Sequence, residues 1–132
     1  MTGILEGVRV IDMGQVVAVP AACAILADLG ADVIKVEPLT GEIQRGVKMA
    51  GTSDINWAIQ LLNRNKKGLA LDLKQESGRE IMYKLVRKAD VFMSNYEAST
   101  LQKLKMDYTT LSSCNPGLVY ATLTGYGAYG PD

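Results

Sequence analysis

Short apolar runs alternate along the chain with stretches in which apolar residues recur at helical spacing. The apolar runs lie at residues 8–11, 33–36, 69–73, 90–94 and 118–123. The clearest helical stretch is 77–89, where apolar positions form one stripe and charged positions the opposite face. Strands that alternate with helices are typical of βαβ crossovers and parallel pairing. The pattern predicts an α/β fold with a doubly wound, mainly parallel five-stranded sheet, Rossmann-like, in three αβα layers.

The first of these units, Gly7 to Glu37, contains a loop that suits a ligand. Its helix is predicted to begin at Pro20, whose fixed φ suits a first turn, and to end at Gly30, which tolerates a positive φ. The loop before it, residues 12–19, therefore meets a helix N-terminus, where unpaired N–H groups suit an anion. Gly14 is the only glycine in that loop, so the dinucleotide fingerprint G-x-G-x-x-G and the P-loop pattern are both absent. From its residues alone, the loop is explained equally well by a simple connection and by a phosphate or nucleotide contact.

Several later loops and helix caps can be assigned from local composition. Residues 42–54 are predicted to form a polar loop or lid, and Asp54 to cap the short helix that follows. The basic segment 63–68 is interpreted as a solvated connection, with phosphate contact as the alternative if it faces a ligand crevice. Ser77 and Glu80 match a capping box at the start of the next helix.

Two polar residues follow the fourth apolar run. Asn95 and Tyr96 stand just past its carboxyl end, which is the edge where ligands bind in open α/β sheets. A Gly- and Tyr-rich loop, residues 124–131, follows the last run and is expected at the same edge. This edge of the sheet is therefore the predicted ligand site.

The amino-acid composition limits the partners and the kinds of catalytic or metal site that this chain can have. Fourteen basic residues balance fourteen acidic ones, and no basic stripe with aromatics appears, so nucleic acid is not an expected partner. No apolar run approaches the ~20 residues of a membrane span, and the first residues lack a signal-peptide pattern. Cys23 and Cys114 make no disulfide framework, which favours free thiols in the cytoplasm. The chain has no histidine, which removes Ser–His and Cys–His catalysis and the commonest zinc ligand, so we expect no metal.

Four blocks of sequence, in this order, resemble the N-terminal part of family III CoA-transferases. The blocks read LEGVRVIDM with VPAACAILADLGADVIKVEP, then LNRNKKGLALDLK, then GRE with LVRKADVFMSNY, then NPGLVYATLTGYGAYGPD. That family includes formyl-CoA, carnitine and bile-acid CoA-transferases and the related α-methylacyl-CoA racemases. The set of blocks covers essentially the whole chain, and it is specific, whereas any one block alone would be weak.

The resemblance implies that residues 1–132 are a single Rossmann-like domain that binds coenzyme A, the N-terminal segment of a longer cytoplasmic protein. The longer protein would form an interlocked homodimer and move CoA between an acyl-CoA and a carboxylic acid, with no metal. Its nucleophile would be an aspartate located after Asp132. We therefore expect no catalytic residue in this chain, and no transferase activity from the chain alone.

The resemblance also assigns coenzyme A contacts. These are Gln15, Val16, Val17 and Ala18 in the first loop, Pro38, Leu71 and Lys74 on the adenine side, and Asn95 and Tyr96 along the CoA channel. Lys103 and Leu104 match an Arg–Met pair of the family, in which the cation can meet the phosphates. Read without the resemblance, the two leucines are ordinary core residues and the two lysines ordinary surface charges. Three departures from the family pattern are Val19 and Lys105, where glycine is usual, and the segment 97–99, where Arg-Pro-Gly is usual.

Three other functions stay open at this point. The chain is also compatible with a fragment of an α-methylacyl-CoA racemase, or with a CoA- or nucleotide-binding module without chemistry. A phospho-receiver domain shares the five-stranded architecture and would use Asp12, but no paired acidic residues accompany it, so this reading is the least favoured.

Overall fold

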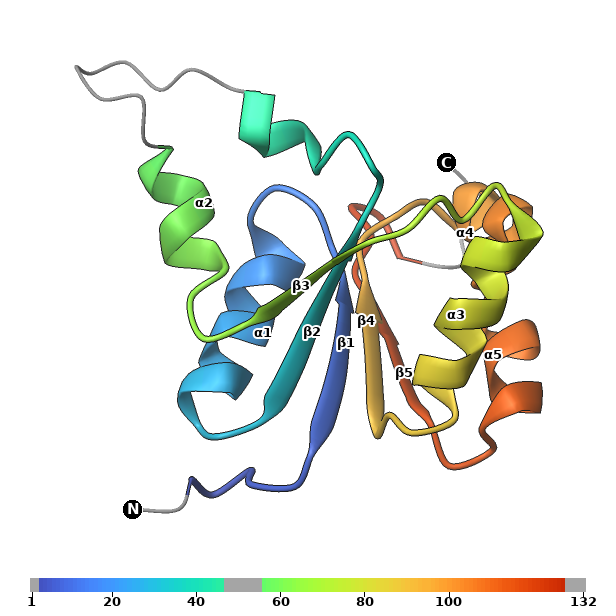
Figure 1. The fold of residues 1–132 in the computed structure, drawn as a ribbon, viewed down its shortest axis with the longest axis horizontal. Coiled ribbons are helices and arrows are strands. Elements are labelled where there is room, and N and C mark those ends of the chain that lie inside the picture. Colours follow the sequence, from blue (N-terminus) through green and yellow to red (C-terminus); the bar gives the residue numbers. More distant parts are fainter. Residues whose placement is uncertain (1–2, 47–55, 128–132) are drawn as a thin grey trace.

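A computed structural model describes residues 3–46 and 56–127, which form one five-stranded sheet with helices on both faces (Figure 1). The strands are β1 Arg9–Met13, β2 Asp32–Glu37, β3 Lys67–Ala70, β4 Val91–Ser94 and β5 Val119–Thr122. The helices are α1 Ala18–Asp28, η1 (3-10) Ile43–Gly46, α2 Trp57–Leu62, α3 Glu76–Val86, α4 Ala98–Leu104 and α5 Tyr108–Cys114. The strand order is β3-β2-β1-β4-β5, and every pair is parallel. The predicted doubly wound α/β fold is confirmed.

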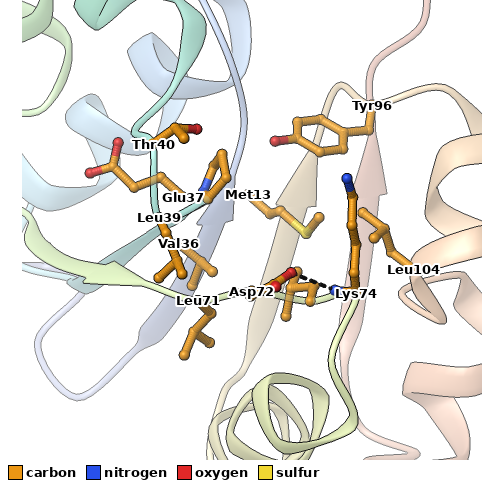
Figure 2. Close-up of a pocket in the computed structure, with 12 residues that line it drawn as sticks. Met13, Val36, Glu37, Leu39, Thr40, Leu71, Asp72, Lys74, Tyr96 and Leu104 are labelled. Carbon is orange, nitrogen blue, oxygen red and sulfur yellow. Dashed lines mark hydrogen bonds between the residues drawn. The ribbon is translucent and has the colours of Figure 1, made fainter.

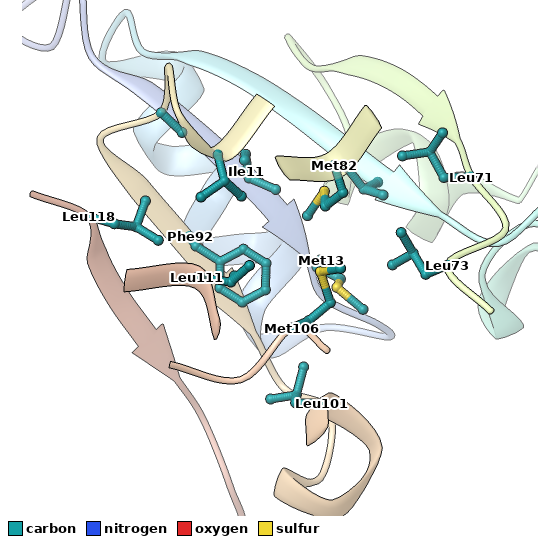
Figure 3. Close-up of a cluster of buried hydrophobic side chains, with 13 residues drawn as sticks. Ile11, Met13, Leu71, Leu73, Met82, Phe92, Leu101, Met106, Leu111 and Leu118 are labelled. Carbon is teal, nitrogen blue, oxygen red and sulfur yellow. The ribbon is translucent and has the colours of Figure 1, made fainter. Parts of the chain in front are cut away.

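Two apolar cores lie on opposite faces of the sheet. Helix α1 packs on one face and contacts α2, and its core includes Val10, Cys23 and Val33. Helices α3 and α5 contact each other on the other face, where Ile11 and Phe92 meet Met82 (Figure 3). Successive residues of β1 alternate between these faces, because side chains along a strand point to opposite sides.

Strand β1 is longer than its apolar run predicts. The loop was expected to begin at Asp12, but Asp12 pairs with Lys35 in β2 and Met93 in β4, and Met13 pairs with Ser94. The expected boundary is therefore wrong by two residues. Backbone hydrogen bonds to β2 and β4 keep Asp12 in the central strand, although aspartate has a low propensity for β-strands.

Strand β3 is displaced toward the N-terminus relative to the prediction. The apolar run 69–73 was expected to be the strand, but the strand begins at Lys67, which pairs with Ile34. The run's last residues, Leu71 to Leu73, lie beyond it. Leu71 and Leu73 are nevertheless buried, because they cover the α3 face of the sheet after the strand has ended.

The ends of the helices agree only in part with the predicted caps. Gly30 ends α1 with φ +103, and the N–H of Ala31 donates to the carbonyl of Leu26 in a Schellman arrangement. Helix α1 begins at Ala18 and not at Pro20, although its first turn still accommodates the proline. The predicted Ser77 capping box is wrong, since α3 starts at Glu76 with Gln75 as its N-cap.

Asp54, predicted to cap the next helix, lies outside the described residues, as does most of the expected lid. The described helix α2 has Asn56 as N-cap, whose side chain accepts from the N–H of Ile59 at 3.2 Å.

No helix within the described ranges combines the length and the apolar character that a membrane crossing requires.

The two cysteines should differ sharply in reactivity. Cys23 is a fully buried residue of α1 that packs against the sheet, and burial raises the pKa of its thiol to about 12. The thiolate is the reactive form, so Cys23 should resist alkylation while the partly exposed Cys114 reacts. Iodoacetamide labelling of the native chain, read by peptide mass spectrometry, should modify Cys114 first. Labelling in denaturant should modify both, and equal native rates would contradict the packing of α1 on the sheet.

Candidate functional site

The strand order reverses between β1 and β4, and the loops after these two strands meet at the carboxyl edge of the sheet. Asn95 follows β4 and forms two hydrogen bonds with the backbone of Gln15. Its Oδ1 accepts from the Gln15 N–H at 2.7 Å, and its Nδ2 donates to the Gln15 carbonyl at 2.9 Å. The Gln15 side chain in turn donates to the Tyr96 hydroxyl at 2.6 Å. Gln15 and the neighbouring residues Asn95 and Tyr96, which lie 80 and 81 positions further along the chain, therefore form one connected group.

The loop that leads into α1 is held in an unusual backbone conformation. Its Gly14 N–H donates to Asp12 Oδ1 at 2.8 Å, and its Gly14 carbonyl accepts from the Lys35 ammonium at 2.5 Å. Val16 has φ 61, in the left-handed region that a β-branched side chain rarely enters. Such a residue costs about 1–3 kcal/mol and persists only where surrounding contacts impose it.

A pocket of about 430 Å³ opens beside this group, bounded by the segments that follow β2 and β3 (Figure 2). Five of the predicted residues line it: Pro38, Leu71, Lys74, Tyr96 and Leu104. Sequence reasoning missed its other wall residues, which are Met13, Val36, Glu37, Leu39, Thr40, Asp72 and Leu73. Four of these seven residues are apolar, and all seven lie in the last two residues of β1 or β2 or within three residues after β2 or β3. This position at the carboxyl edge of the sheet was the sequence signal that could have identified them.

The pocket combines apolar walls with one cation. Figure 2 shows the ammonium of Lys74 directed toward Tyr96, beside Leu104. Across residues 3–46 and 56–127, no carboxylate lies within ion-pair distance of this ammonium. An unpaired lysine beside apolar surface can bind a phosphate of a ligand whose ring system lies on that surface.

Tyr96 can also take part in binding as a neutral donor. Burial raises the pKa of its phenol, and the hydrogen bond from Gln15 offsets only part of that rise. The hydroxyl is therefore protonated at neutral pH. Since its oxygen already accepts from Gln15, its proton is available to a ligand oxygen.

The segment 38–46, whose first residues form one wall of the pocket, is tied to the end of β2. Arg45 donates to both oxygens of Glu37 at 2.7 Å, and the N–H of Glu42 donates to the same carboxylate at 3.0 Å. Burial disfavours the charged Glu37 carboxylate, but the hydrogen bonds from Arg45 and Glu42 outweigh it, and its pKa is lowered. The wall is thus preformed and not a loose flap.

Other predicted contacts lie outside the pocket. Lys103 is exposed on the last turn of α4. Val16 and Val17 lie in the loop before α1 and are about half exposed, and Ala18 is the exposed first residue of α1. These residues can reach a ligand only where it extends beyond the pocket along the loop.

The cations of the basic segment 63–68 form ion pairs within the described residues. Lys66 is buried, with its ammonium 2.7 Å from Asp12 Oδ2, and Arg64 pairs with Asp28. Lys67 donates to Asp32 at 2.6 Å. Because each cation is paired with a carboxylate, the alternative in which this segment meets phosphates loses its support.

The departures from the family pattern have local explanations. Lys105 takes the left-handed conformation (φ 58) that a glycine would usually supply after α4. Val19 is 3% exposed and packs against Gly14. Glu97 is exposed at the start of α4 and, with Asn95, borders a shallow hollow of about 360 Å³.

No cluster of three or more metal-ligating side chains occurs in the part of the chain that the structure describes.

Comparison with known proteins gives a consistent result. Residues 5–132 match the family described as CoA-transferase family III. An (R)-2-hydroxy-4-methylpentanoate CoA-transferase from Clostridioides difficile is 36% identical over 97% of this chain and 33% of its own length. A formyl-CoA:oxalate CoA-transferase from Streptomyces avermitilis is 38% identical over 96% of this chain and 31% of its own length. The crystal structure of Rv3272 from M. tuberculosis superposes with a TM-score of 0.89 at 39% identity, over 98% of this chain and 37% of that one. The chain thus spans about a third of the length of the curated relatives it matches.

Proposed function

The chain belongs to CoA-transferase family III, and from this we propose that it is the coenzyme-A-binding part of an enzyme that moves CoA from an acyl-CoA to a carboxylic acid. One observation carries the proposal: Gln15, Asn95 and Tyr96 are joined by hydrogen bonds at the edge of a pocket that contains the ammonium of Lys74, which pairs with no carboxylate of residues 3–46 and 56–127. The names of the two relatives support the reaction type, because each denotes a CoA-transferase.

In this proposal the pocket binds the adenosine end of coenzyme A. The apolar surfaces of Pro38 and Leu71 contact the ring, and Lys74 pairs with a phosphate. Tyr96 donates its proton to a second oxygen of the ligand. The remainder of the ligand follows the loop at Gln15, where Val16 and Val17 offer exposed apolar side chains.

The chemistry proposed for the longer protein uses a carboxylate nucleophile and no metal. The carboxylate attacks the thioester carbonyl, the C–S bond breaks, and CoA leaves as a thiolate, so that the donor acyl group and the enzyme carboxylate are joined as a mixed anhydride. The thiolate then attacks the enzyme's acyl carbon, which frees the donor acid and leaves a CoA thioester on the enzyme. Attack by the acceptor carboxylate and return of the thiolate give the new acyl-CoA and regenerate the nucleophile. We assign none of these covalent steps to a residue of this chain.

Domain organisation, location and assembly belong to the same proposal. Residues 1–132 are taken as a single CoA-binding domain, and the longer protein as a cytoplasmic, interlocked homodimer. The free state of Cys23 and Cys114 supports a reducing compartment. The remaining support is the family resemblance.

Lys74 gives the most direct test of coenzyme A binding. In a calorimetric titration the wild-type chain should bind CoA saturably, and Lys74→Met should bind about tenfold more weakly, because a charge-assisted contact to phosphate is lost. The affinity should also fall with added salt, and this slope should be smaller in the variant.

The matched control is Lys84→Met, which removes an exposed lysine of α3 outside the pocket. Its affinity should equal that of the wild type. Absence of saturable CoA binding by the folded wild-type chain would refute the proposed function, and equal losses in both variants would refute the role of Lys74.

A further inference from the structure

Four ionisable side chains are buried together between the sheet, α1 and the segment after β2. Asp12, Lys35 and Glu42 are each at most 2% exposed, and the side chain of Lys66 is 1% exposed. Lys35 Nζ lies 2.8 Å from Glu42 Oε2 and 3.8 Å from Asp12 Oδ1, and Lys66 Nζ lies 2.7 Å from Asp12 Oδ2. Two positive and two negative charges therefore balance in a site shielded from water.

Lys35 is the member of this cluster that connects two parts of the candidate site. Its ammonium donates to the carbonyl of Gly14, in the loop before α1, at 2.5 Å. The same ammonium donates to Glu42, in the segment whose first residues form a pocket wall. Lys35 thus joins the loop and the wall through one buried group.

The contacts of Lys35 complete the restraint on the loop. The Asp12 carboxylate accepts a hydrogen bond from the N–H of Gly14, and the Lys35 ammonium donates one to the Gly14 carbonyl. The Asn95 side chain accepts from the N–H of Gln15 and donates to the Gln15 carbonyl. Four successive backbone polar groups are therefore held by side chains from β1, β2 and the end of β4. The left-handed Val16 follows directly, so these side chains impose the strained conformation.

We propose that Lys35 is a positioning residue for ligand binding, and this inference rests on the proposed function. Lys35 is too deeply buried to touch coenzyme A, and it acts by holding the Gly14 carbonyl and the Glu42 carboxylate at fixed places. Without it the loop loses the restraint that presents Gln15 and Val16 to the ligand. The expected loss is in affinity as well as in stability.

Lys66 provides a matched control within the same cluster. It also pairs with Asp12, but its second contact is the carbonyl of Pro20 inside α1, at 2.7 Å, and not the loop. Replacing either lysine by methionine leaves the cluster with the same net charge. Both variants should therefore lose stability, and only one should lose the loop restraint.

The experiment compares Lys35→Met with Lys66→Met in the 132-residue chain. CoA affinity is measured by calorimetry, and the amide signals of Gly14 and Gln15 by NMR. Lys35→Met should bind CoA at least about tenfold more weakly and shift both amide signals, because a hydrogen bond to a charged group is lost. Lys66→Met should stay within about threefold of wild-type affinity with both signals in place.

Wild-type affinity in Lys35→Met, or equal losses in the two variants, would overturn the proposal. If the wild-type chain does not bind CoA, the proposed function fails. The amide signals then still decide whether Lys35 positions the loop, because they need no ligand.

A second variant covers the case in which Lys35→Met does not fold. Lys35→Met combined with Glu42→Gln removes one positive and one negative charge together and leaves the Asp12–Lys66 pair neutral, so we expect this variant to fold. The double variant should also bind CoA at least about tenfold more weakly. Binding at wild-type affinity would overturn the role of Lys35.

Discussion

Replacement of Asp12 by alanine should lower the free energy of unfolding by about 3–5 kcal/mol, the range found when one partner of a buried ion pair is removed. Asp12 is fully buried, and its carboxylate faces the ammonium groups of Lys66 at 2.7 Å and Lys35 at 3.8 Å. Without it, Lys35 keeps the carboxylate of Glu42, but the buried ammonium of Lys66 loses its paired carboxylate. The N–H of Gly14 also loses its acceptor. Urea denaturation followed by circular dichroism measures the loss.

The loss is large because a domain of this kind is stable by only about 5–15 kcal/mol. Asp32→Ala is the matched control, since Asp32 also accepts from two cations, Arg9 at 3.0 Å and Lys67 at 2.6 Å. Its side chain is 25% exposed, however, and water screens the pair. The control should lose about 1 kcal/mol or less. Similar losses at the two positions would show that burial of Asp12 is not what makes its contacts important.

The architecture could be predicted from the sequence because short apolar runs alternate with helical stretches. Residues past the ends of two strands, such as Gln15 and Asn95, could be placed together because parallel strands deliver their loops to one edge. Boundaries were less accurate where pairing with neighbouring strands outweighs local preference. Asp12 is the clearest case, because an acidic residue after an apolar run favours a loop until its two lysine partners are known.

The buried charge cluster was not predicted, and the reason is physical. Lys66 lies among other polar residues and therefore looks like part of a solvated connection, yet the fold buries its ammonium on Asp12. Glu42 has only one local signal, its place in a polar loop. The informative signal was Lys35, a charged residue inside an apolar run that parallel pairing buries on both faces. A lysine at such a position needs a buried carboxylate, and Asp12 in the neighbouring strand was the available one.

The pocket was predicted through resemblance more than through pattern. Leu71 and Leu104 have the local signature of core residues, and only the family blocks marked them as ligand contacts. The structure places both in the wall of one pocket. Lys103 was also assigned as a ligand contact by resemblance alone, but its side chain is on the exposed side of α4. It precedes Leu104 by one residue, and one residue along a helix turns the side-chain direction by about 100°.

Replacement of Gly14 by alanine should weaken CoA binding by about tenfold or more, through the shape of the loop and not through any contact of its own. A Cβ atom at Gly14 would lie 2.5 Å from Val19 Cγ1 and 2.9 Å from Pro20 Cδ. Val19 is β-branched and buried, and the proline ring is rigid, so neither can move aside. The Gly14 carbonyl is meanwhile held by Lys35. The strain must therefore displace either the loop or the first turn of α1.

Calorimetric titration with CoA measures this effect, and urea denaturation should show a stability loss of about 1–3 kcal/mol beside it. Gly68→Ala is the matched control, because a Cβ at Gly68 would meet nothing within 4 Å, and it should bind CoA like the wild type. Adding Val19→Gly to Gly14→Ala removes the nearer of the two side chains that the new methyl group meets, while Pro20 Cδ at 2.9 Å remains. This second change should restore part of the lost affinity if the collision with Val19 is a cause. Wild-type binding by Gly14→Ala alone would mean that the close packing of the loop on α1 is not what shapes the site.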